Sequence, residues 1–165
     1  MNALMVLLSC HHHITKQVAD VIARVIGAEV RAPQDVSPGE VSGYDLLGMG
    51  SGIYGGRHHQ SLLDLAGAMP PVTSRTAFLF STSSAVMMGH ADSRRFQDYV
   101  GGIHAPLREK LISKGYTVIG EYSCPGFNTN SFIRHFGGLN KGRPNAEDLA
   151  RAEAFAERML TEASR

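Results

Sequence analysis

Three short stretches of small and polar residues could do chemistry in this sequence, because each follows an apolar run. They are residues 9–15, 50–56 and 81–84. The first suits a phosphate group, since a turn that leads into a helix aims backbone N–H groups and the positive end of the helix dipole at one point. The second is rich in glycine and suits close approach to a flat ring, on which Tyr54 could stack. The third offers hydroxyls and amides to a polar ring edge.

Alternating strands and helices position these stretches. Residues 3–8 form an unbroken apolar run, which is typical of a strand buried on both faces of a parallel sheet. Thr15 then stands at the N-cap position of an amphipathic helix. Four further strands are expected at 28–31, 46–50, 76–80 and 116–122, and further helices at 37–44, 62–69, 106–114 and 146–160. The alternation predicts an α/β fold with a parallel sheet and helices on both faces.

Parallel strands end at one edge of their sheet, so the three polar stretches are expected to meet there, where open α/β sheets bind ligands. Residues 85–102 add material beside this edge. Phe96, Tyr99, Val100 and Ile103 have helical spacing, but two consecutive glycines at 101 and 102 interrupt it. We therefore expect a lid-like insertion over 85–102.

The composition excludes several classes of protein. With 165 residues, 43% hydrophobic and 19% charged, the chain is expected to form a single domain over 1–165. Its net charge of +1 gives no basic stripe for nucleic acid. No apolar run is long enough for a membrane span, and no basic residue precedes the first run as in a secretory signal. With its 2 cysteines expected as reduced thiols, the protein is expected in the cytoplasm.

Two other ligand classes compete at these stretches. Histidines at 11–13 and 58–59 invite a metal site, but consecutive side chains on a loop point in different directions and no i, i+4 pair supports them. Residues 50–55 match the dinucleotide pattern G-x-G-x-x-G after a strand, but the following strand does not end in the acidic residue that would hold a ribose. We therefore expect no metal and no dinucleotide, and we assign no catalytic side chain.

Two features outside the strand ends have both a structural and a functional interpretation. Lys141 and Arg143 could form a second anion site, but with Asn145 as a cap this segment is better explained as the start of the last helix. Cys10 and Cys124 follow strands that are separated in the expected order, which disfavours a disulfide and leaves a buried, inert thiol as the favoured interpretation.

At this point the sequence resembles the flavodoxins, in particular the short flavodoxin-like proteins of prokaryotes. The resemblance runs over nearly the whole chain. Its most specific parts are residues 9–15, residues 44–54 (YDLLGMGSGIY) with His58 and His59 just after, residues 120–127 (GEYSCPGF) and residues 138–145 (GLNKGRPN). Membership would imply a flavodoxin-like three-layer sandwich with a five-stranded parallel sheet of order 2-1-3-4-5, and FMN as cofactor.

The resemblance also implies which residues would hold FMN. They are Ser9, His11, His12, His13, Ile14 and Thr15 around the phosphate, Gly52, Ile53, Tyr54 and Gly55 along one side of the flavin, and Thr82, Ser83 and Ser84 along the other. The sequence departs from the family at His13 and Ile14, where similar sequences usually carry Gly-Asn. The near-neutral charge also differs from the acidic surface of dedicated carrier flavodoxins.

The implied function is electron transfer by bound FMN, with redox partner proteins or a small electron donor or acceptor. An FMN-dependent NAD(P)H or quinone oxidoreductase remains an alternative. The departure at His13 and Ile14 keeps open a third possibility, a flavodoxin-like scaffold that has lost FMN. Substrate, partner and oligomeric state are not indicated by the sequence.

Overall fold

The computed structural model describes residues 1–9, 14–83, 93–126 and 142–165, in which strands and helices alternate. The strands are β1 (Ala3–Leu8), β2 (Glu29–Arg31), β3 (Leu46–Tyr54), β4 (Arg57–His58), β5 (Arg75–Ser83) and β6 (Tyr116–Pro125). The helices are α1 (Ile14–Ile26), α2 (Gln60–Ala68), α3 (Arg94–Ser113) and α4 (Ala146–Ala163), with 3-10 turns at Pro33–Asp35 and Glu40–Gly43.

The main strands pair in the order β2-β1-β3-β5-β6, all parallel. The short β4 lies off this path and pairs antiparallel with the end of β3. Without β4, the order is the predicted 2-1-3-4-5. The expected flavodoxin-like architecture is confirmed.

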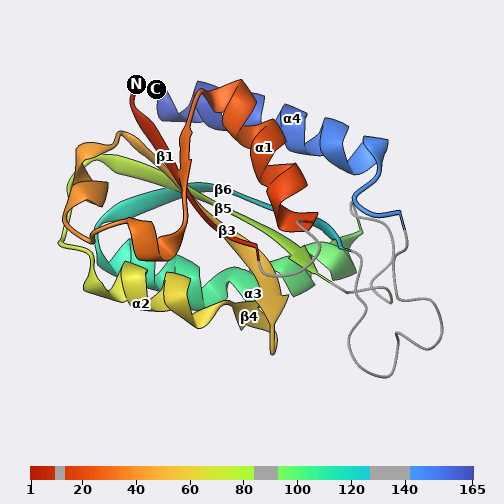
Figure 1. Ribbon diagram of the computed structural model, residues 1–165, viewed down its shortest axis with the longest axis horizontal. Coiled ribbons are helices and arrows are strands. Elements are labelled where there is room, and N and C mark those ends of the chain that lie inside the picture. The colour runs from red at the N-terminus through yellow and green to blue at the C-terminus, as the bar shows by residue number, and fades with distance from the viewer. Residues whose placement is uncertain (10–13, 84–92, 127–141) are drawn as a thin grey trace.

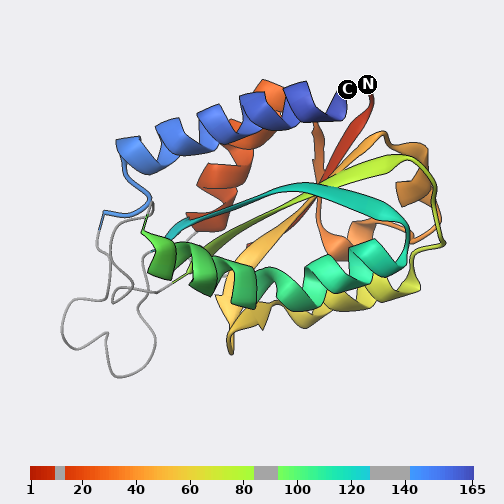
Figure 2. The ribbon, with the colours of Figure 1, turned by 180° about the vertical axis from the view of Figure 1, so that it is seen from behind.

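Helices cover both faces of the sheet, as Figures 1 and 2 show. Helices α1 and α4 lie on one face, where Met5 of β1 packs with them in a core that includes Phe78 and Phe155. Helices α2 and α3 cover the other face, where Leu4 and Val6 of the same strand are buried. Successive side chains of β1 therefore enter two different cores, which explains its unbroken apolar run.

The glycine-rich stretch is not the loop that the sequence predicted, because β3 continues through it to Tyr54. A Cβ atom on Gly48 or Gly50 would lie 2.4 Å from a ring atom of Phe78 or Phe80, respectively. These two glycines thus make room for aromatic rings of β5, not for a ligand. The turn itself is Gly55-Gly56, with φ of +57° and +79°, typical of a two-residue β-hairpin.

The predicted lid is wrong from residue 94 onward, because α3 runs without interruption from Arg94 to Ser113. Ser93 caps this helix by accepting a hydrogen bond from the amide of Phe96 at 3.2 Å. Phe96, Val100 and Ile103 are all buried. Burial of this apolar face outweighs the helix-breaking tendency of the glycines at 101 and 102, which costs about 1 kcal/mol each. Residues 84–92 of the expected insertion lie outside the described residues.

Helix starts were predicted with mixed success. Asn145 caps α4 in a capping box with Asp148, and Arg143 forms an ion pair with the same carboxylate, so this segment is the start of a helix as expected. Thr15 does not cap α1, because that helix already begins at Ile14. The helix expected over 37–44 is only the 3-10 turn Glu40–Gly43.

Both ends of the chain lie side by side at the edge of the sheet opposite the carboxyl ends of the strands (Figures 1 and 2). The backbone amide of Asn2 donates to the Asp45 carboxylate at 2.8 Å, which fixes the first residues beside β3. In the described ranges, no helix combines the length and apolar character needed to cross a membrane.

Candidate functional site

The carboxyl ends of the strands bring the three polar stretches to one edge of the sheet. Leu8 at the end of β1 lies beside Ser51 of β3, and Gly52 lies beside Thr82 of β5. The ends of β1, β3 and β5 are therefore neighbours. This is the edge at which open α/β sheets bind ligands.

A pair of buried threonine hydroxyls joins the first stretch to the third. Thr15 Oγ1 lies 2.8 Å from Thr82 Oγ1, and both residues are buried. The end of β6 closes over them, because a Cβ on Gly126 would lie only 3.1 Å from Thr82 Cβ and 3.3 Å from Ile14 Cγ2. The amide of Gly126 also donates to the carbonyl of Ser83 at 2.7 Å. The Thr15 hydroxyl thus belongs to a packed strand-end cluster.

Two serine hydroxyls at this edge are buried without a hydrogen-bond partner among the described residues. They are Ser9 Oγ, just after β1, and Ser83 Oγ, at the end of β5. A buried hydroxyl that makes no hydrogen bond costs about 1–3 kcal/mol. Both hydroxyls lie at the strand ends that carry the Thr15–Thr82 pair, where they can donate to a polar ligand that accepts hydrogen bonds.

The hairpin after β3 supplies an aromatic ring to the same edge. The Tyr54 ring folds back over its own strand, so that a Cβ on Gly52 would lie 3.2 Å from the Tyr54 hydroxyl. The Tyr54 and His59 rings meet edge to face, with their centroids 5.4 Å apart. Ile53 pairs with His58 across the hairpin.

The predicted cofactor residues divide into two groups. Those that the structure describes are Ser9, Ile14, Thr15, Gly52, Ile53, Tyr54, Gly55, Thr82 and Ser83. The remaining four, His11, His12, His13 and Ser84, lie outside the described residues. Within the described ranges, no group of three or more histidine, cysteine or carboxylate side chains is arranged to hold a metal.

A row of serines crosses the sheet one residue before the strand-end cluster. Ser51 of β3 lies opposite Ser81 of β5, which lies opposite Ser123 of β6. His58 of β4 bonds to the first serine and His104 of α3 to the second, and their rings lie 4.8 Å apart between centroids. We use the term histidine network for Ser51, Ser81, Ser123, His58, His104 and Glu121.

The hydrogen bonds of this network run from the buried Ser81 to the partly buried Glu121. His104 Nε2 lies 2.8 Å from Ser81 Oγ, and His104 Nδ1 lies 3.2 Å from Glu121 Oε2. Arg108 Nη1 donates to the other carboxylate oxygen, Glu121 Oε1, at 2.6 Å. Burial opposes ionisation of Glu121, but hydrogen bonds from His104 and Arg108 outweigh it and hold the pKa of that carboxyl below its ordinary value.

Serine, histidine and glutamate occur here in the order of an acyl-transfer triad. However, Ser81 and His104 each have 0% of their surface exposed. The Ser81 hydroxyl also donates to Ser123 Oγ at 2.9 Å, so its proton is directed away from the histidine. This arrangement presents no nucleophile to a substrate.

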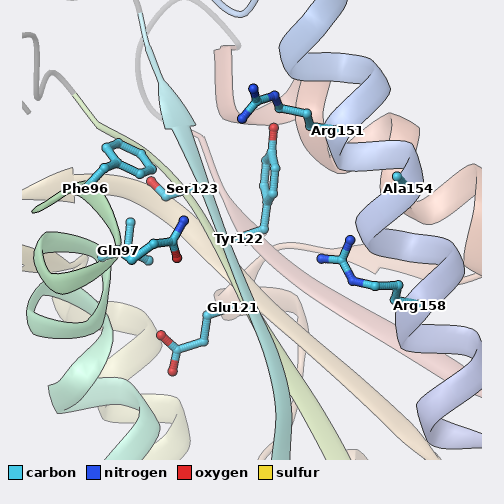
Figure 3. A pocket seen from close by; sticks show the side chains of 9 residues that line it. Phe96, Gln97, Glu121, Tyr122, Ser123, Arg151, Ala154 and Arg158 are labelled. Carbon is cyan, nitrogen blue, oxygen red and sulfur yellow. The ribbon is translucent and has the colours of Figure 1, made fainter. Parts of the chain in front are cut away.

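A pocket of ≈ 400 Å³ lies against the network where β6 forms the edge of the sheet. Figure 3 shows its walls: Glu121 points toward α3, whereas Tyr122 points toward α4. Arg151 and Arg158 extend their guanidinium groups from α4 toward the strand. The pocket thus reaches two members of the network, Glu121 and Ser123, from the surface.

Comparison with known proteins relates this architecture to others. No family model matches the sequence. A protein of Methanocaldococcus jannaschii, described as the uncharacterized protein MJ0298, is 38% identical over 160 residues, which cover 97% of this chain and 99% of that protein. At this identity and coverage, the chain belongs to the same family as the M. jannaschii protein.

Solved flavodoxin structures share the fold. Oxidised flavodoxin 1 of Bacillus cereus matches with a TM-score of 0.69 and 20% identity, covering 97% of this chain and 98% of that chain. This chain has the flavodoxin-like fold. The Fusobacterium nucleatum flavodoxin bound to flavin mononucleotide matches with a TM-score of 0.66 and 14% identity, covering 98% of this chain and 99% of that chain.

Sequence reasoning missed the histidine network of this flavodoxin-like protein. Ser81 was interpreted as the first residue of a polar turn, although β5 continues to Ser83. His104 was not considered, because it falls between the lid expected over 85–102 and the helix expected from 106, whereas it lies within α3. A usable signal was present in β3 and β5, where Ser51 and Ser81 directly follow the apolar part of the strand.

Proposed function

We propose that this flavodoxin-like protein binds FMN at the carboxyl edge of its sheet and passes electrons to and from redox partner proteins. The observation that carries the proposal is the pair of buried, unpartnered hydroxyls, Ser9 Oγ and Ser83 Oγ, among the described residues of that edge. They lie, like the Thr15–Thr82 pair, at the strand ends where a phosphate and a flavin ring are expected. When bound, FMN supplies the redox chemistry, and the protein binds it, orients it and tunes its potential.

In this proposal, different groups of the predicted residues contact the phosphate and the two sides of the flavin. Ser9 and Thr15, with residues 11–14, would hold the phosphate. Residues 52–55 would line one side of the flavin, and residues 82–84 the other. The Fusobacterium flavodoxin with the same fold is described as bound to flavin mononucleotide, which supports the choice of cofactor. The carrier role is favoured over a substrate-enclosing oxidoreductase, because helix α3 occupies residues 94–102, where a lid was expected.

The test of this proposal is a comparison of FMN with riboflavin, which lacks the phosphate. The purified protein should be yellow or take up FMN, with fluorescence quenching on binding. Thr15→Ala should weaken FMN more than riboflavin, because a charge-assisted hydrogen bond to the phosphate contributes about 1.5–3 kcal/mol. Thr117→Ala is the matched control, since Thr117 is exposed near the start of β6, far from the strand ends.

Two results would contradict the proposal. A colourless protein that does not quench FMN fluorescence would show that FMN does not bind. Equal losses of FMN and riboflavin in Thr15→Ala would place the phosphate elsewhere on the molecule.

A further inference from the structure

Strand β6 forms one edge of the sheet, and its outer side pairs with no other described strand. Figure 2 shows it in front of the other strands, with α4 above it and α3 below it. The pairing with β5 skips Ile119, which is therefore a bulge, and is regular from Gly120 to Pro125. The backbone N–H and C=O groups on the outer side of residues 120–124 can therefore pair with an added strand.

The pocket of ≈ 400 Å³ lies against this regular part of β6, at residues 121–123. Successive side chains of a strand point to opposite faces, and here Glu121 points toward α3 whereas Tyr122 points toward α4 (Figure 3). We use the term edge groove for this pocket, which has residues 121–123 as its floor and helices α3 and α4 as its walls. An extended segment laid along β6 would direct its own alternate side chains toward the two walls, as in recognition by strand addition.

The wall formed by α4 is positively charged. Arg151, Ala154 and Arg158 line it at helical positions i, i+3 and i+7, which share one face. The small side chain of Ala154 leaves room between the two guanidinium groups, which extend toward β6 (Figure 3). Arg158 lies over the Phe155 ring, 5.7 Å from its centroid, and forms no ion pair within the described ranges. Arg151 pairs with Glu147 at 3.0 Å, but that carboxylate is 70% exposed, so the pair is weak.

The wall formed by α3 carries no uncompensated charge. Glu121 Oε1 accepts a hydrogen bond from Arg108 at 2.6 Å, and Glu121 Oε2 lies 3.2 Å from His104 Nδ1. Both oxygens of this carboxylate therefore have partners, and Arg108 balances its charge. The α3 side chains that line the groove are uncharged: Phe96, Gln97 and Val100. The arginines of α4 thus determine which charge the groove favours in a ligand, and it is negative.

We propose that the edge groove binds an acidic extended segment of a partner protein, which adds a strand to β6 and directs carboxylates toward Arg151 and Arg158. The two arginines lie about 10 Å apart along the helix axis, at a rise of about 1.5 Å per residue. Alternate side chains of a strand are about 7 Å apart, and the long arginine side chains span the difference. Main-chain hydrogen bonds to β6 supply affinity, and the guanidinium groups select acidic side chains.

A second copy of this chain fits the groove less well than an acidic segment. The single carboxylate in the regular part of β6 is Glu121, and its oxygens already bond to Arg108 and His104. Two β6 strands paired edge to edge would therefore bring no carboxylate of the added strand to Arg158. The charge of the α4 wall favours a different chain.

The first test measures binding of a fluorescein-labelled peptide of four Val-Glu repeats by fluorescence anisotropy, at about 50 mM salt and without flavin. A peptide of four Val-Lys repeats is the charge-reversed control and should not bind. Arg158→Gln should weaken binding of the acidic peptide about 5-fold, and addition of Arg151→Gln should weaken it further. Arg165→Gln is the matched control, because Arg165 follows the end of α4 and its side chain is 70% exposed outside the groove. Equal binding of the two peptides, or an equal loss in Arg165→Gln, would overturn the proposal.

The second test distinguishes strand addition from attraction by charge alone. Hydrogen exchange, followed by NMR with the acidic peptide bound, should be slowed about 10-fold or more at alternate amides within residues 120–124, because these amides gain hydrogen-bond partners. The amides of Gly55 and Gly56 in the β3–β4 turn should be unaffected, and free glutamate should slow no amide of β6.

Three outcomes would refute strand addition by a partner. Binding of the peptide without slower exchange in β6 would mean that charge alone holds it. Slowing of the same amides by free glutamate would mean that the groove is a site for small anions. A dimer in sedimentation, with these amides already protected in the absence of peptide, would place a second copy in the groove. Because no flavin is present in either test, their results stand whether or not the protein binds FMN.

Discussion

At the scale of single residues, the ionisation of His58 is linked to folding. Its pKa is lowered by burial and by His104, so the folded protein favours the neutral ring. The unfolded chain binds this proton near the ordinary histidine pKa of about 6.5. Stability contributed by neutral His58 is therefore present above about pH 6.5 and is lost as the pH falls below it, by at most about 1.4 kcal/mol per pH unit.

Acid should consequently destabilise this protein through His58. We expect the free energy of unfolding, measured by urea denaturation between about pH 5 and pH 8, to fall with acid more steeply in the unmodified protein than in His58→Gln. His59→Asn serves as the control and should keep the steep dependence. Parallel slopes for His58→Gln and the unmodified protein would show that folding does not lower the pKa of His58.

At the scale of elements, two glycines of similar appearance in the sequence have opposite roles. A Cβ on Gly50 of β3 would lie 2.4 Å from the buried Phe80 ring, whereas a Cβ on Gly101 of α3 meets nothing within 4 Å. Gly50→Ala should destabilise the fold by about 1–3 kcal/mol through overpacking. Gly101→Ala should stabilise it by up to about 1 kcal/mol, because alanine has the higher helix propensity. Thermal unfolding of both variants measures whether each change lowers or raises the stability of the fold. A Gly50→Ala variant as stable as the unmodified protein would disprove the packing explanation.

These glycines also show what the sequence could and could not predict. The apolar runs predicted the central strands β1, β3 and β5, because burial on both faces leaves a continuous hydrophobic signal. The strand order was implied by the resemblance to flavodoxins. The end of β3 and the start of α3 were missed, because the glycines in both segments were interpreted as loop residues. The glycine in β3 is explained by the neighbouring Phe80 ring, and the glycines in α3 are tolerated because the helix buries its apolar face around Phe96. Serines and histidines that bond across strands leave no local pattern, so the histidine network required the register of β3, β5 and β6.

At the scale of the whole molecule, Cys124 reports on opening of the sheet from its helices. It is 1% exposed, and burial raises the pKa of its thiol to about 12, which agrees with the inert thiol expected from the sequence. In a Cys10→Ser background, where Cys124 is the remaining cysteine, a thiol reagent should react only as fast as the protein unfolds. The rate should rise with urea in parallel with loss of helical signal. Rapid reaction without denaturant would contradict the burial of this strand end.

The adjacent chain ends have a practical consequence. They lie together at the edge of the sheet opposite the strand-end cluster (Figures 1 and 2). A tag, an electrode tether or a fused electron donor attached at either end would therefore leave the candidate cofactor site unobstructed. A short flexible linker could also join the two ends and permit circular permutation, with new ends opened at the exposed Gly55-Gly56 turn of the β3–β4 hairpin.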